Sequence, residues 1–217
     1  MTPPLSLIAL LASCAAEQKP EQPVATTYET VPNTVMTVWQ PIHYARLREA
    51  SPTDNFSGKP LYLGASADGI EMALVQYNAE RLKEMDVERA VLQFSVGQTC
   101  HSSYVLTYPK CGNDLTIEAH VVQFLWEQSI VTWASFHELP KLYNPTILGT
   151  TLLNVSEGEH RQYTVDVTTA VKAWISGKAN YGIALIADEK GRKKGRLEQT
   201  DTVLDYAPEL IVYTSHF

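Results

Sequence analysis

The sequence predicts an all-β protein, a jelly-roll-like antiparallel β-sandwich with one short helix. Several segments alternate apolar and polar residues with the two-residue period of a half-buried strand. Turn signals such as Asn144-Pro145 and Ser156-Glu157-Gly158 separate these segments. The stretch Met36–Phe217 has about 180 residues, a length that suits one sandwich domain.

The N-terminus carries an apolar run, Leu5–Ala12, directly before Ser13-Cys14. The run is too short to cross a bilayer, but it is typical of a secretory signal peptide. Leu11-Ala12-Ser13-Cys14 resembles the lipobox of bacterial lipoproteins, in which cleavage falls before a cysteine that becomes lipidated. We expect a signal peptide over residues 1–13, lipidation of Cys14, and a protein anchored by lipid at the outer membrane or cell surface. A buried first strand is the alternative.

Residues 14–35 are predicted to form a flexible tether behind the lipidated cysteine. The stretch from Ala15 to Asn33 is rich in Pro, Gln, Glu and Thr and has no apolar period. Such a composition buries too little apolar surface to fold. The sandwich domain is therefore expected over residues 36–217.

Strand patterns follow in the segments "AVLQFSV", "SSYVLTY", "TIEAHVVQFLW", "IALIA" and "ELIVYT". In the third, the apolar set begins at Ile117 and Ala119 and then changes phase to Val122, Phe124 and Trp126. A slip of one residue turns every later side chain to the other face, so a β-bulge is expected near Val121.

The helix is predicted within Tyr163–Leu185. A strand period up to Val167 gives way there to the helical spacing Val167, Val171, Trp174 and Ile175, and Gly177 ends it. Asp166 and Thr168 are residue types that cap a helix start. A catalytic role for Asp166 would need a second carboxylate or a histidine, so capping is the simpler interpretation.

The four tryptophans fall into two groups, three expected in the core and one expected to be exposed, according to the residues around them. Trp126, Trp133 and Trp174 lie in the apolar pattern and are expected in the core rather than as sugar-stacking platforms. Trp39 lies outside the strongest strand patterns and, like Tyr143, is a candidate for exposure.

Cys100 and Cys111 are an even pair once Cys14 is set aside, and in an exported protein they are expected to form a disulfide. A metal or redox pair is the alternative, although the CxxC spacing is missing. Closing this loop would stabilise the fold by roughly 2–3 kcal/mol.

Charge sets limits on the partners. The chain has 24 acidic and 17 basic residues, a formal net charge of -7, which argues against nucleic acid. Five basic residues nevertheless gather in one segment, expected at a hairpin tip: Lys190, Arg192, Lys193, Lys194 and Arg196. They are candidates to bind an anionic glycan. A solvated hairpin that resists edge pairing is the alternative.

Motifs for catalysis or zinc are missing from the sequence. The six histidines are scattered without HExxH spacing, and neither GxSxG nor a phosphate-binding glycine loop occurs. We expect no enzyme activity and no cofactor. A structural calcium ion at Asp54, Asn55 and Asp68-Gly69 is left open beside the simpler Asx turn.

Five segments together resemble one family, the DNRLRE-type domain, a β-sandwich grouped with carbohydrate-binding modules. They are "SPTDNFSGKPLYLG" (Ser51–Gly64), "DVERAVLQFSV" (Asp86–Val96), "LWEQSIVTW" (Leu125–Trp133), "VDVTTAVKAWISGKANYGIAL" (Val165–Leu185) and "APELIVYT" (Ala207–Thr214). The resemblance covers Ile42–Thr214 and implies a non-catalytic surface module that binds polysaccharide. A structural or adhesive envelope protein that contacts protein partners is the alternative.

Overall fold

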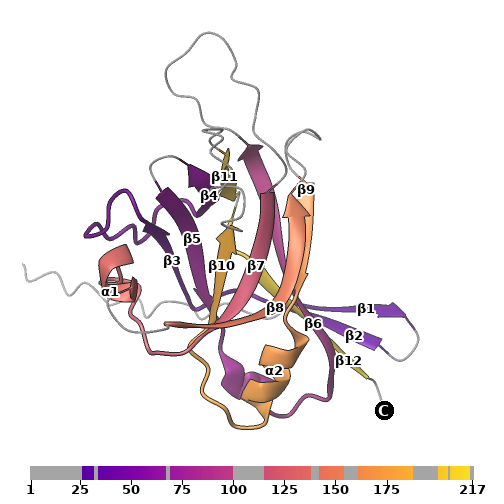
Figure 1. Cartoon of the computed structure of the whole chain (residues 1–217). Coiled ribbons are helices and arrows are strands. Elements are labelled where there is room, and N and C mark those ends of the chain that lie inside the picture. Colours follow the sequence, from indigo (N-terminus) through magenta and orange to yellow (C-terminus); the bar gives the residue numbers. More distant parts are fainter. Residues whose placement is uncertain are drawn as a thin grey trace, which may run out of the picture.

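A computed structural model of the chain describes residues 26–31, 34–66, 69–99, 115–137, 142–153, 161–187, 200–204 and 206–215. Within them, β-strands form two antiparallel sheets packed as a sandwich, together with two short α-helices and one 3-10 helix (Figure 1). The predicted all-β sandwich is confirmed. In this part of the chain no helix is long and apolar enough to span a bilayer.

The strands are β1 (Thr26–Val31), β2 (Thr34–Trp39), β3 (His43–Arg48), β4 (Tyr62–Ser66), β5 (Gly69–Gln76), β6 (Val87–Thr99), β7 (Leu115–Val122), β8 (Tyr143–Leu153), β9 (Arg161–Asp166), β10 (Ile183–Ala187), β11 (Thr200–Leu204) and β12 (Glu209–Ser215). The helices are η1 (Ala79–Leu82), α1 (Trp133–His137) and α2 (Thr168–Ile175).

Hydrogen-bonded neighbours follow one path, β1-β2-β12-β6-β11-β4-β5-β10-β7-β8, while β3 pairs with β5 and β9 pairs with β6. The long strand β6 connects the two layers. Its first part pairs with β12, its middle lies between β12 and β9, and its last part pairs with β11. The last strand of the path, β8, lies beside β9, which is paired with β6 (Figure 1). The strands therefore surround the interior almost completely.

The main core fills the space between the layers, and its side chains come from the predicted strand faces. Leu92, Phe94 and Val96 of β6 all point into it. At one end α2 closes the sandwich (Figure 1), with Val171 and Trp174 buried in the same core. The predicted core position of Trp174 is therefore confirmed.

A second apolar cluster lies on the outer face of β3, β5 and β10. Leu47, Met72 and Ile186 from these strands pack against Trp126 and Phe136. The latter two belong to the connection that follows β7 and contains α1, which lies beside β3 and β5 (Figure 1). Burial on both faces explains why β5 and β10 are apolar along almost their whole length.

The start of α2 agrees with the sequence only in part. Asp166 Oδ1 accepts a hydrogen bond from the Thr168 amide at 2.9 Å, but Asp166 precedes the N-cap residue Val167, which makes no side-chain cap hydrogen bond. Thr168 Oγ1, however, bonds the amide and the carbonyl of Ala90 in β6. Asp166 thus positions the helix start, and Thr168 joins the helix to the sheet.

The β-bulge predicted near Val121 is confirmed, since the register between β7 and β8 shifts between Ala119 and Val122. The predicted inward position of Phe124 is wrong, because this side chain is 43% exposed. β7 ends at Val122, so the two-residue period stops before Phe124. Trp126 is buried for a different reason, which is that its loop folds back over the sheet.

Two further expectations are corrected. Trp39 is buried in the main core rather than exposed, because β2 pairs with β12 and carries its side chain inward. The tether does not extend to residue 35, because Thr26–Val31 forms β1 and pairs with β2. A polar edge strand needs little apolar surface of its own, so composition alone does not reveal it.

Candidate functional site

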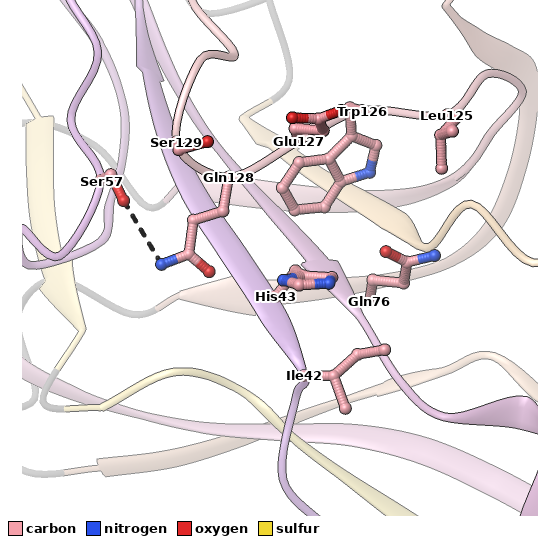
Figure 2. Close-up of a pocket in the computed structure, with 9 residues that line it drawn as sticks. All are labelled: Ile42, His43, Ser57, Gln76, Leu125, Trp126, Glu127, Gln128 and Ser129. Atoms are coloured by element: carbon pink, nitrogen blue, oxygen red, sulfur yellow. Dashed lines mark hydrogen bonds between the residues drawn. The ribbon is translucent and has the colours of Figure 1, made fainter. Parts of the chain in front are cut away.

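A groove opens beside β3, and we call it the Trp126 groove. It encloses about 500 Å³. Four segments distant in sequence supply its walls: the start of β3, the β3–β4 connection, the end of β5, and the loop between β7 and α1. The lining residues are Ile42, His43, Ser57, Gln76, Leu125, Trp126, Glu127, Gln128 and Ser129 (Figure 2).

The aromatic part of the groove is a pair of rings. Trp126 is only 8% exposed, and its Nε1 donates a hydrogen bond to the Tyr181 carbonyl at 2.8 Å. The exposed His43 ring meets it edge to face, with the centroids 6.3 Å apart and an interplanar angle of 70°. The buried indole therefore packs against an imidazole that solvent can reach.

The loop that carries Trp126 is fastened to the neighbouring β3–β4 connection. Asn55 Nδ2 donates to the carbonyls of Gln128 and Val131, at 3.1 and 2.7 Å. Asn55 Oδ1 accepts from the Ser57 amide at 3.0 Å, which is the Asx turn expected from the sequence. These bonds leave the groove with a preformed wall.

Two glutamine amides line opposite ends of the groove in fixed orientations. Gln128 Oε1 accepts from the Tyr44 amide at 3.1 Å, and its Nε2 faces Ser57 Oγ at 3.4 Å (Figure 2). Gln76 Nε2 donates to the Asn180 carbonyl at 2.9 Å. The groove thus combines aromatic and aliphatic surface with amide and hydroxyl groups.

Charge in the groove is sparse. Among the lining residues, all of which belong to the described part of the chain, Glu127 is the one carboxylate. It is exposed and makes no ion pair with another described residue. In the same part of the chain, no group of three or more His, Cys, Asp or Glu side chains could hold a metal ion. This arrangement suits recognition of a neutral polar ligand.

A second hollow, of about 430 Å³, lies near the first and is lined in part by Tyr44, Lys59 and Tyr206. The Tyr44 amide is the group that holds Gln128, so the two hollows share one stretch of β3. The fixed amides of Gln76 and Gln128 line the first hollow and not the second.

The site residues predicted from the sequence fall in parts of the chain that the structure does not describe. Cys14, Cys100, Cys111 and the segment Lys190–Arg196 lie outside the described residues, as does Asp68. The hairpin expected around Lys190–Arg196 likewise lies outside the described residues. The strands described before and after that segment, β10 and β11, pair with β5 and β7 and with β4 and β6.

The sequence contained one signal for the groove, the adjacent apolar pair Phe124-Leu125 before Trp126, of which Leu125 lines the groove. These apolar side chains are exposed although they follow a strand pattern. A comparison with protein-family models found no matching family, and a search of curated proteins found no matching sequence. The resemblance to the DNRLRE-type domain stays a prediction that rests on the five segments.

Proposed function

We propose that this protein is a non-catalytic module that binds polysaccharide or another cell-envelope glycan through the Trp126 groove. The main supporting observation is the ring pair of His43 and Trp126, which lies beside the hydrogen-bonded side-chain amides of two glutamines. Sugars present apolar faces rimmed by hydroxyl groups, so a groove with rings and a few fixed hydrogen-bonding groups complements them. The lipid anchor at Cys14 would hold the module at the outer membrane or cell surface.

The charge of the groove supports binding without cleavage. Most glycoside hydrolases place two carboxyl groups about 5–10 Å apart across the bond that they cleave. Glu127 has no carboxylate partner among the described lining residues. A bound glycan would therefore meet one carboxylate and neutral hydrogen-bonding groups.

A glycan array probed with the full chain, with and without calcium, tests the proposal. We expect binding that His43→Ala weakens about three- to tenfold, since an aromatic contact of this kind contributes about 0.5–1.5 kcal/mol. His43 is exposed, so the variant should fold. His137→Ala is the matched control, because His137 is also exposed but stacks on Trp133 in α1, whose residues do not line the groove.

Failure to bind any neutral or acidic glycan on the array would overturn the proposal. It would favour the alternative of a structural or adhesive protein with protein partners.

A further inference from the structure

We propose that the Trp126 groove selects sugars that carry an acetamido group, that is, N-acetylhexosamine units of a glycan. The inference rests on the proposed function and adds the chemical class of the ligand. It is carried by the orientation of two amides, by the aliphatic side chains beside them and by the charge of the groove.

Gln76 supplies a fixed hydrogen-bond acceptor. Its Nε2 is held by the Asn180 carbonyl at 2.9 Å. Asn180 is itself fixed, since its Nδ2 donates to the Tyr77 carbonyl at 2.7 Å and its Oδ1 accepts from the Gly182 amide at 3.0 Å. Gln76 Oε1 makes no hydrogen bond within the described residues and points toward the side of the ring pair (Figure 2). It can therefore accept an N–H from a ligand.

Gln128 supplies the complementary donor. Its Oε1 is occupied by the Tyr44 amide at 3.1 Å, which determines which end of the side-chain amide carries the nitrogen. Nε2 has two N–H groups, and Ser57 Oγ at 3.4 Å engages one of them weakly. The other N–H is left for a ligand oxygen. A secondary amide offers one N–H and one C=O, so an acetamido group can pair with this acceptor or with this donor.

The aliphatic side chains match the methyl group of an acetamido substituent. Ile42 and Leu125 line the groove, and both are exposed large apolar residues, with Leu125 74% exposed. Covering one methyl group corresponds to about a fourfold gain in affinity. A sugar hydroxyl at the same position would leave these side chains in water.

The charge of the groove further narrows the ligand class. Glu127 is the one carboxylate among the described lining residues, so an acidic sugar would meet a charge of the same sign. An acetamido sugar is neutral and avoids that repulsion. A de-acetylated amino sugar is cationic, and any attraction to the exposed Glu127 would be screened by salt.

Calorimetry with the full chain and three β-1,4-linked tetramers tests the inference. The tetramers are built from glucose, from glucosamine and from N-acetylglucosamine, and they differ only at the 2-position. We expect the N-acetylated tetramer to bind about tenfold or more tightly than the glucose tetramer, through one methyl contact and one paired amide. The preference should persist at high salt.

Equal affinity for the glucose and N-acetylated tetramers would overturn the inference and leave the proposed function standing. The same conclusion would follow if other glycans on the array bound and no N-acetylated glycan did. Failure to bind any glycan would overturn both the proposed function and the inferred selectivity. The two failures are therefore distinguishable.

A matched pair of variants locates the selectivity. Leu125→Ser should weaken binding of the N-acetylated tetramer about fourfold and leave the glucose tetramer unchanged. Ile130→Ser is the control, because Ile130 is 65% exposed on the same loop but does not line the groove. Equal effects of the two variants would show that Leu125 does not contact the acetamido methyl group and would count against the inference.

Discussion

The backbone of Gly149 in β8 lies so close to the backbone of Asp166 in β9 that no side chain fits between them. A Cβ at position 149 would lie 2.5 Å from the Asp166 carbonyl oxygen and 3.1 Å from its nitrogen. Unbonded carbon atoms prefer separations of about 3.5–4.0 Å. The missing side chain is what allows β8 to approach β9 and the strands to surround the main core.

Gly149→Ala should therefore push β8 away from β9 and lower the free energy of unfolding by about 1–3 kcal/mol, the usual cost of overpacking. Urea denaturation measures the change. Thr150→Ala, at the next and exposed position of β8, should change it by less than about 0.5 kcal/mol. A Gly149→Ala protein as stable as the wild type would show that β8 and β9 do not meet this closely in solution.

Gly177 and Gly182 form a natural matched pair. Both have positive φ, +96° and +94°, but a Cβ at Gly177 would meet nothing within 4 Å, whereas one at Gly182 would lie 2.2 Å from the Val75 carbonyl oxygen. Gly177→Ala should cost about 1–2 kcal/mol of stability from backbone strain alone. Gly182→Ala should cost about 1–3 kcal/mol more, because β5 must move. Chemical denaturation that ranks the two variants equally would contradict the contact with Val75.

Tyr77 connects the end of β5 to the start of β12, and its hydroxyl donates to the Pro208 carbonyl at 2.6 Å. Burial raises the pKa of this hydroxyl well above its ordinary value of 10.0, and the charge of Glu209 raises the pKa further. The unfolded chain loses the proton near pH 10, whereas the folded protein keeps it. The contribution of this hydroxyl to the free energy of unfolding is therefore fully present below about pH 10. It is lost as the pH rises toward the pKa of the folded state.

Above about pH 10, ionisation of Tyr77 in the unfolded chain lowers the free energy of unfolding by at most about 1.4 kcal/mol per pH unit. Tyr77→Phe should remove this part of the pH dependence. At neutral pH it should cost about 1 kcal/mol through the lost hydrogen bond. Urea denaturation between pH 7 and about pH 11 measures both effects. Tyr206→Phe, at an exposed position, controls for the substitution itself. An unchanged alkaline slope in Tyr77→Phe would contradict the assignment to Tyr77.

The sequence predicted the features that depend on local period. The strand faces around Phe94, the helix that buries Trp174 and the bulge near Val121 each leave a repeat in neighbouring residues. It missed α1, which has only five residues and too few turns to show a helical period. It also missed the polar edge strand β1.

The groove could not be predicted, because the apolar pair Phe124-Leu125 does not reveal which other segments line it. His43, Gln76 and Gln128 come together only because β3 pairs with β5 and the loop after β7 folds over both.

We predict that the basic segment Lys190–Arg196 binds polyanions independently of the groove. Replacing Lys193, Lys194 and Arg196 by Ser removes three positive charges. It should weaken binding to polygalacturonate, a uronic-acid polymer, by at least about tenfold at low salt, because each ion pair with the polymer contributes up to about 1 kcal/mol. The loss should shrink as salt screens the remaining charges.

Titration of the polymer at several salt concentrations measures both effects. The control replaces Lys59, Lys172 and Lys178 by Ser, three exposed residues outside the segment, and thus removes the same charge. Equal losses in the two triple variants would assign the binding to net charge alone. Unchanged binding after the first replacement would sink the hypothesis that this segment binds polyanions.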